Sequence, residues 1–400
     1  MTVNFCISWA LSVRAAAVVV AAPLLLALPA EYLLRHPTIR SLGLSNPFTP
    51  FFLLSYPVPP PARAQAATTT ADFEGQLYIK GPADLLLLAW TIVVCSLLRL
   101  LLGRHLLPVL ARRLGITNHR KLVRFGEQGY ALVYFALFGA WGVYIMSISR
   151  TWWFHTAAFW LEYPHTHLPA AMKRYYLCQM AYWLQQFLVL ALDLEKRRSD
   201  YWQLVLHHCV TVWMVNCSYL MNLTLLGNAV FISMDVPDAA LALSKLLNYL
   251  GLARAKVVSF AVFVVLWTYF RHYLSIRILW SLWYEFEELV PRHAQIFSPR
   301  TGLYLPPWMR DQMLSPLCVL QGLNLFWYYL ILRILVRSIM TSETDDNRSD
   351  DEGDDEEEEE KTKPSSEIGV LASGMTDKGR ANGTDVGVRA RAREGGGAKV

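Results

Sequence analysis

The chain has 400 residues, of which 54% are hydrophobic and only 17% are charged, and its formal net charge at pH 7 is +5. A soluble domain usually contains ~45–50% apolar and ~25% charged residues. The apolar residues of this chain fall into runs of the ~20 residues that cross a bilayer as a helix. The composition therefore excludes an ordinary soluble protein and predicts an all-α, polytopic integral membrane protein.

The first apolar run begins near the N-terminus with "RAAAVVVAAPLLLALPA", a pattern also typical of secretory signal peptides. The run continues through "EYLL" and is longer than the apolar part of such a signal, so it predicts a retained anchor helix. In chain order, hydropathy predicts about eight membrane spans, at residues 13–34, 84–107, 128–149, 174–192, 202–221, 224–244, 257–280 and 314–337.

Composition divides the chain further. The predicted parts are an N-terminal anchor helix (1–35), a lumenal Pro- and Ala-rich loop (36–83), the second span with a basic cytosolic loop (84–127), a densely hydrophobic helical body (128–340) and a disordered acidic cytosolic tail (341–400). The tail has too few apolar side chains to pack. In this tail Ser342 and Ser349 each stand three residues before an acid, which makes them candidate phosphorylation sites.

The tail also conceals the charge of the membrane body. Without the twelve Asp and Glu residues between positions 345 and 360, the net charge would change from +5 to +17. Lys and Arg are enriched in cytosolic connections, and here they gather between spans two and three, four and five, and six and seven. This alternation predicts that both termini are cytosolic and that residues 281–313 are lumenal.

Ionisable side chains inside the predicted spans are the strongest functional signal, because such groups are costly in hydrocarbon. Ser199 and Asp200 predict a helix cap, which places His207 and His208 ~11–14 Å below the cytosolic end of span five. Asp235 and Asp238 lie at a similar depth on the returning span six, and their spacing of three puts both on one helical face. Two imidazoles and two carboxylates are thus predicted to share one polar chamber.

Other polar residues extend this chamber. Gln179, Tyr182 and Gln186 form a polar stripe on span four. Arg271 and His272 lie deeper on span seven, and two interpretations stay open for them: packing between helices or lining a pore. Single intramembrane His or Gln residues often serve only as interhelical hydrogen bonds. Neither the ten histidines nor the six cysteines show metal-ligand spacing, so no metal is expected.

The chemistry available to a buried His–Asp cluster is limited. A neutral imidazole can deprotonate an amine or attack an activated acyl group, and a carboxylate beside it can fix its tautomer. A chamber open to the cytosol and flanked by lipid would accept a water-soluble thioester and a lipid. The residues therefore suggest acyl transfer onto a membrane lipid, whereas a transporter is less favoured because no inverted repeat of hydropathy is visible.

The stretch "RRSDYWQLVLHHCVTVWMVNCSYLMNLTLLGNAVFISMDVPDAALALSKLLNYLG" resembles the Lag motif of ceramide synthases, the catalytic members of the TLC-domain family. "RHYLSIRILWS", "LQGLNLFWYYLILRI", "LSYP" and "YIKGPADLLLLAW" resemble the fungal branch. The residues that match the motif are Lys196 to Asp200, His207, His208, Ser218, Tyr219, Gly227, Asp235, Asp238, Lys245 and Tyr249. The resemblance covers roughly residues 50–340.

This resemblance implies a six-helix bundle around a polar chamber that transfers an acyl group from acyl-CoA to a sphingoid base in the endoplasmic reticulum. It implies no cofactor, because acyl-CoA is a substrate, and no nucleic acid partner. It also implies association with a small single-pass membrane subunit, or a homo- or heterodimer. A non-catalytic, lipid-sensing TLC-domain protein is the alternative, although such proteins differ at the His pair.

The predicted roles follow from the motif and the depth argument together. His207, His208, Asp235 and Asp238 are the candidate catalytic residues, and either His can be the general base or a transient acyl acceptor. The candidate substrate-binding residues are Gln179, Tyr182, Gln186, Ser218, Tyr219, Lys245, Asn248, Tyr249, Arg271 and His272.

Overall fold

The computed structural model describes residues 12–36, 39, 44–59, 75–194, 199–292, 295–298, 303–306 and 308–341. All of them belong to one compact unit, Met1–Ser349. Ser342, Ser349 and the basic cluster at 196–198 lie outside the described residues, as does the acidic tail beyond position 341. The predictions for these positions therefore stay predictions.

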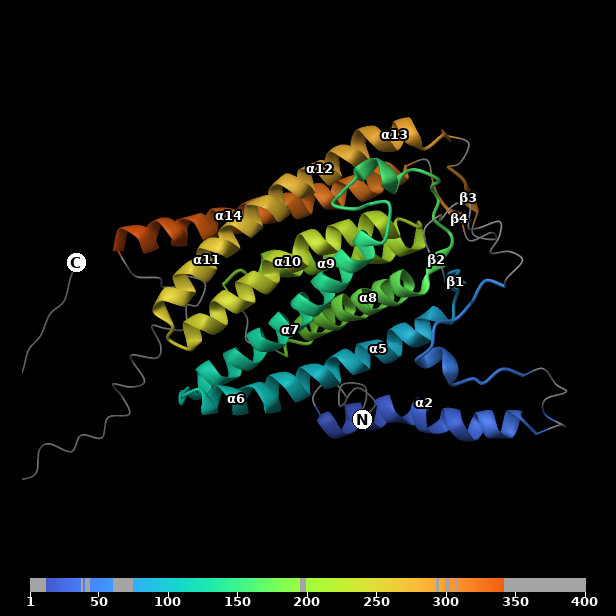
Figure 1. Ribbon diagram of the computed structural model, residues 1–400, viewed down its shortest axis with the longest axis horizontal. Coiled ribbons are helices and arrows are strands. Elements are labelled where there is room, and N and C mark those ends of the chain that lie inside the picture. Colours follow the sequence, from blue (N-terminus) through green and yellow to red (C-terminus); the bar gives the residue numbers. More distant parts are fainter. Residues whose placement is uncertain are drawn as a thin grey trace, which may run out of the picture. The chain divides into compact units, whose positions relative to one another are not determined.

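Helices form nearly all of the described structure, which confirms the all-α prediction (Figure 1). The long helical segments are α2 (Val13–Leu34); α5, η2 and α6 (Asp84–Leu98, Arg99–Leu106, Leu107–Arg113); α7 (His119–Ser147); α8 (Ala170–Ala191); α9 (Tyr201–Leu220); α10 (Thr224–Tyr249); α11, η4, α12, η5 and α13 (Ala253–Trp267, Thr268–Leu274, Ser275–Trp280, Ser281–Glu285, Phe286–Leu289); and α14 (Met309–Thr341). Each predicted span coincides with one of these segments.

Five of the segments are long and apolar enough to cross a membrane by length and composition alone: α2, α5 to α6, α7, α11 to α13 and α14. The remaining three, α8, α9 and α10, are the helices that carry the glutamines, histidines and aspartates singled out above. These polar side chains lower the hydropathy of the three helices, and most of them are buried against other helices.

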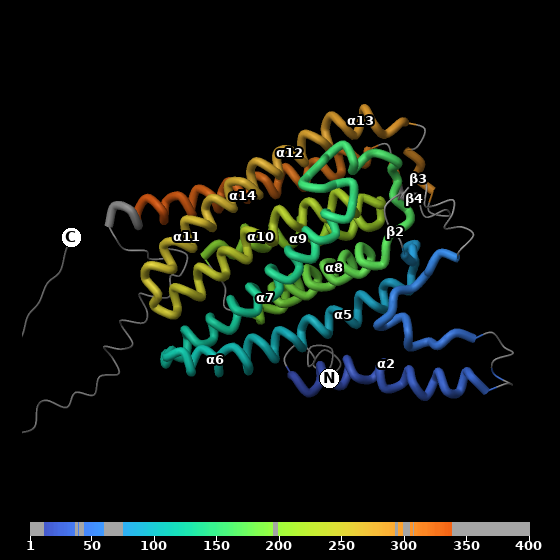
Figure 2. Tube along the Cα trace, in the orientation of Figure 1, coloured from blue at the N-terminus to red at the C-terminus, as the bar shows by residue number. Residues whose placement is uncertain are grey.

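Contacts between neighbouring helices close six segments into a ring, and Figures 1 and 2 show these segments running roughly side by side. Helix α7 packs against α8 and α10, α8 against α9, α9 against α14, α14 against α12, and α10 against α11. Outside the ring, α5 packs against α8, and α2 packs against α5. The ring gives α8, α9, α10, η4 and α14 a shared interior.

Short strands mark one end of the ring, which we call the strand end. There β1 (Leu77–Tyr78) pairs antiparallel with β2 (Leu168–Pro169), and β3 (Phe297–Ser298) with β4 (Leu303–Tyr304). The short helices η1 (Thr49–Phe51) and η3 (Thr156–Phe159) lie in the connections. We call the opposite end, where α6 ends and α7 and α11 begin, the basic end, because it carries Arg112, Arg113, Arg120, Lys121, Arg254 and Lys256.

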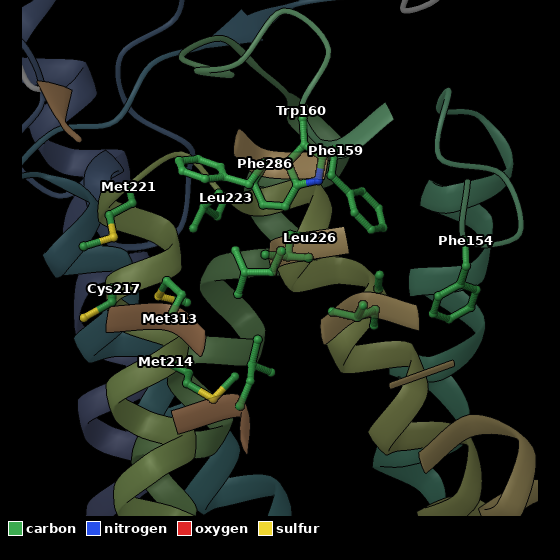
Figure 3. Close-up of a cluster of buried hydrophobic side chains, with 14 of the residues drawn as sticks. Phe154, Phe159, Trp160, Met214, Cys217, Met221, Leu223, Leu226, Phe286 and Met313 are labelled. Atoms are coloured by element: carbon green, nitrogen blue, oxygen red, sulfur yellow. The ribbon is translucent and has the colours of Figure 1, made fainter. Parts of the chain in front are cut away.

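A large apolar cluster fills the ring near the strand end. Figure 3 shows Trp160 beside Phe286, with Leu223 and Leu226 below them. The Trp160 and Phe286 rings meet edge to face at 5.2 Å, and the indole Nε1–H of Trp160 donates to Ser281 Oγ at 2.8 Å. The cluster connects the loop after α7 to α9, α10, α13 and α14.

A polar network lies beside this cluster, at the start of α5 and the end of α9. The buried Lys173 Nζ forms an ion pair with Asp84 at 2.7 Å, and Tyr219 Oη donates to the same carboxylate at 2.9 Å. Lys80 Nζ donates to the carbonyl oxygens of Tyr219 at 2.6 Å and Leu220 at 2.8 Å. The network therefore holds the last turn of α9.

The close approach of α8 to α10 explains why the motif has a glycine at position 227. A Cβ added there would overlap the hydroxyl of Tyr176 on α8, which also hydrogen-bonds Ser218. Gly322 on α14 has no atom within 4 Å of the corresponding position.

We expect Gly227→Ala to lower the melting temperature of the detergent-purified protein, because overpacking typically costs about 1–3 kcal/mol. Gly322→Ala is the matched control, and it should leave the melting temperature unchanged or raise it, since alanine is the better helix former. Equal behaviour of the two variants would contradict the close approach of α8 and α10.

Burial lowers the pKa of Lys80 from 10.5 to about 7, although Asp84 opposes this shift. Between these two values the unfolded chain binds more protons than the folded chain, so folding stability should rise as the pH increases from 7 towards 10. A neutral Lys80 still donates its hydrogen bonds.

We expect Lys80→Met to flatten the rise of the melting temperature between pH 7 and 9, measured in detergent. The exposed Lys121 on α7 provides the control, and Lys121→Met should retain the slope of the wild type. A slope that survives in Lys80→Met would show that another group is responsible.

Candidate active site inside the helical ring

The two histidines lie in the second turn of α9, and both are buried. His208 Nδ1 lies 2.9 Å from the carbonyl oxygen of Leu204, one turn earlier. A carbonyl oxygen can only accept, so Nδ1 carries the proton and Nε2 is the basic nitrogen of this ring. His207 Nδ1 is buried and has no hydrogen-bond partner among the described residues. The two imidazoles are therefore oriented by different means.

Two tryptophans enclose His207. The ring of Trp183 from α8 lies 5.8 Å from its imidazole, and the ring of Trp327 from α14 lies 5.4 Å away, both edge to face. Trp183 also contacts His208 at 6.0 Å. Aromatic packing from two neighbouring helices thus surrounds the His pair.

Asp200 has a different role from the helix cap that the sequence predicts. It precedes α9, but its side chain makes no capping hydrogen bond. Its Oδ2 instead accepts from Trp327 Nε1 at 3.0 Å. This cross-helix bond supplies the buried indole N–H with an acceptor.

Asp235 is fully buried on α10 and is held by Gln179 of α8 (0% exposed). The Gln179 Nε2 group donates to Asp235 Oδ2 at 2.7 Å and to Tyr175 Oη at 3.1 Å, and its Oε1 accepts from Tyr134 Oη. Asp235 Oδ1 has no hydrogen-bond partner among the described residues. One carboxylate oxygen is therefore fixed by Gln179, and the other is buried without a hydrogen-bond partner among the described residues.

Asp238 forms an ion pair with Arg271 of η4, with 2.7 Å between Asp238 Oδ1 and Arg271 Nη2. Arg271 also donates to Asn324 Oδ1 at 3.0 Å and to the carbonyl of Met234 at 3.2 Å. Met234 belongs to the turn of α10 in which Pro237 removes a backbone donor. The π-helical geometry of η4 is a feature often found at functional sites.

The His pair and the Asp pair belong to one cluster. On α8, Trp183 beside the histidines stands one turn from Gln179, which holds Asp235. On α14, Trp327 stands one turn from Asn324, which binds the Arg271 that holds Asp238. The imidazoles and carboxylates therefore occupy adjacent layers, about 5 Å apart along the helices.

A pocket continues from this cluster between α10, α12 and α14. Its walls are mostly apolar, with Gln321 and Asn324 among the polar residues that line it. Gln321 Nε2 lies 3.0 Å from His272 Nδ1, and the His272 ring contacts Tyr328. Among the described residues, no group of three or more His, Cys, Asp or Glu could hold a metal ion.

The other predicted substrate-binding residues divide by location. Tyr182 stacks on Tyr134 beside the cluster, and Gln186 donates to Gln185 at 3.2 Å towards the basic end. At the basic end of α10, Asn248 accepts from Lys256 at 3.1 Å, near the half-buried Lys245 and Tyr249.

Ser218 and Tyr219 lie at the strand end, where Ser218 bonds Tyr176 and Tyr219 bonds Asp84. Tyr219 is ~16 Å along α9 from His208. The structure therefore does not bring these two residues to the His–Asp cluster.

Sequence reasoning missed Trp183, Trp327, Asn324 and Tyr134 as parts of the cluster. Asn324 offered a signal, because it is a polar residue in an apolar span, three positions after Gln321. The aromatic residues offered none, since tryptophan and tyrosine are common in membrane helices for packing and at their interfaces.

We expect Asp238→Asn to destabilise the protein by roughly 3 kcal/mol, because it leaves the guanidinium of Arg271 buried without its counter-ion. The double variant Asp238→Asn with Arg271→Met removes both charges and should recover most of the lost melting temperature. A double variant that melts as low as the single variant would show that the ion pair is not what stabilises this layer.

Comparison with known proteins gives a second line of evidence about this site. Residues 124–333 match the family described as TLC domain (TRAM_LAG1_CLN8). The chain is 38% identical over 291 residues to Sphingosine N-acyltransferase lac1 of Schizosaccharomyces pombe, covering 73% of this chain and 72% of that protein. It is 36% identical over 287 residues to Sphingosine N-acyltransferase-like protein FUM17 of Gibberella moniliformis, covering 72% and 71%.

A further relative, Ceramide synthase LAG1 of Saccharomyces cerevisiae, is 39% identical over 265 residues, which are 66% of this chain and 63% of that protein. The matched domain spans α7 to α14, the same six segments that close into the ring around the His–Asp cluster. The chain belongs to the TLC-domain family.

Proposed function

We propose that this protein is a ceramide synthase, which transfers the acyl group of a fatty acyl-CoA to the amine of a sphingoid base and forms (dihydro/phyto)ceramide. The observation that carries the proposal is a buried pair of imidazoles about one helical turn from a buried carboxylate, one of whose oxygens has no hydrogen-bond partner among the described residues, inside a ring of helices. The names of the similar fungal proteins support the same reaction.

The reaction needs one base. An imidazole of the pair takes a proton from the sphingoid ammonium, and the freed amine attacks the thioester carbonyl. The C–N bond forms and the C–S bond breaks, and the nitrogen loses a second proton as it becomes the amide. Of the two protons that leave the ammonium, one passes from the imidazolium to the leaving thiolate and the other is released to water. In the covalent alternative, an imidazole first accepts the acyl group and then passes it to the amine.

The geometry suggests where each substrate lies. Asp235 Oδ1 is a buried acceptor without a protein partner, so it is suited to hold the ammonium of the sphingoid base. The anionic part of acyl-CoA would bind at the basic end, where Lys and Arg side chains gather.

The same proposal includes the cellular setting. The basic end faces the cytosol and the strand end faces the lumen of the endoplasmic reticulum, with both termini cytosolic. Acyl-CoA is a substrate, and no further cofactor takes part. A small single-pass subunit, or a second synthase chain, binds the outer surface of the helices.

An acyl-transfer assay tests the function. Purified wild-type protein, His207→Ala and His208→Ala receive dihydrosphingosine and a panel of acyl-CoAs, and amide products are measured by mass spectrometry. We expect amide from the wild type and a loss of at least ~100-fold in one or both variants, because base catalysis contributes about 10²–10⁴-fold.

Leu206→Ala, at an exposed position on the same helix, is the control for losses of activity that come from purification or from any substitution in α9. If folded wild-type protein makes no amide, alone or with fungal membrane partners, but binds dihydrosphingosine, the lipid-sensing alternative would replace the synthase.

A further inference from the structure

Trp327 of α14 contacts both His207 of α9 and Asp200, which directly precedes α9, seven positions before His207. Its indole Nε1–H donates to Asp200 Oδ2 at 3.0 Å, and its ring meets the His207 imidazole edge to face at 5.4 Å. Both Trp327 and Asp200 are buried. The indole therefore connects the start of α9 to an imidazole two turns away.

The orientation of the His207 ring depends on aromatic packing more than the orientation of the His208 ring does. The ring of His208 is oriented by its bond to the Leu204 carbonyl. His207 Nδ1 lacks a hydrogen-bond partner among the described residues, so the packing of Trp183 and Trp327 orients this ring. An indole that is itself anchored by a hydrogen bond restricts the imidazole more than a rotating one.

We propose that Trp327, anchored by Asp200, is a positioning residue that holds the His207 imidazole in its reactive orientation. The proposal rests on the proposed acyl transfer for its effect on rate, but its structural part concerns the His207 ring alone. Loss of orientation costs rate without weakening substrate binding, since a small misplacement of a reacting group can cost up to ~100-fold.

The test compares Trp327→Phe with Trp160→Phe. Trp160 is an equally buried tryptophan whose Nε1–H donates a single hydrogen bond, at 2.8 Å to Ser281, but it lies in the apolar cluster at the strand end. Both variants lose one buried hydrogen bond and part of an indole. Only Trp327→Phe changes the surroundings of His207.

In steady-state assays we expect Trp327→Phe to lower kcat roughly 10- to 100-fold, with the KM values for both substrates within about twofold of wild type. Trp160→Phe should retain the wild-type kcat. Asp200→Asn keeps an acceptor for the indole and should retain most of the rate, whereas Asp200→Ala should reproduce the loss. Combining Asp200→Ala with Trp327→Phe should cost no more than either change alone.

A second measurement does not depend on catalysis. Carbethoxylation of His207 by diethyl pyrocarbonate, followed by fragment mass spectrometry that separates it from His208, reports how tightly the ring is held. We expect several-fold faster labelling of His207 in Trp327→Phe and unchanged labelling in Trp160→Phe.

Unchanged labelling of His207 in Trp327→Phe would overturn the proposal, even if the wild type made no amide and the proposed function failed. A kcat loss shared equally by Trp327→Phe and Trp160→Phe would also overturn it, because that result would reflect general destabilisation.

Discussion

The ion pair between Asp238 and Arg271 is the interaction on which the interior of the ring depends. Neither charge could occupy this depth alone, because an unpaired ion in a low-dielectric interior costs several kcal/mol. The guanidinium is only 3% exposed and is packed over the ring of Trp267, 4.3 Å from its centroid. Pairing therefore fixes the positions of α10 and η4 relative to each other.

The remaining donors of Arg271 extend this constraint to a third helix. Their bond to Asn324 fixes the rotation of α14, and with it the direction of Trp327, one turn further along. On the other side of the cluster, Gln179 fixes α8 against Asp235 and so directs Trp183. The two tryptophans that enclose His207 thus occupy their places because the buried carboxylate of Asp235 and the buried guanidinium of Arg271 require partners.

The helices and the ionisable residues of the cluster could be predicted, whereas the contacts that pair one residue with another could not. Long apolar runs identify membrane helices, and the cost of His207, His208, Asp235 and Asp238 in hydrocarbon marks them individually. Periodicity along one helix, however, does not say which residue faces it from the next helix. Ser218 and Tyr219 show this limit. The motif groups them with the histidines, but in the structure they bond to Tyr176 and Asp84.

Asp200 illustrates the same limit. Its position before a helix predicts a cap, but the bond to Trp327 depends on α14, which begins more than a hundred residues later. Together with the polar network around Tyr219, this bond holds α9 near both of its ends. The His pair lies between these two attachments, on a helix of 20 residues, or about 30 Å. A helix attached in this way cannot rotate about its axis without breaking a buried polar contact, so the imidazoles keep their direction while the substrates enter and leave.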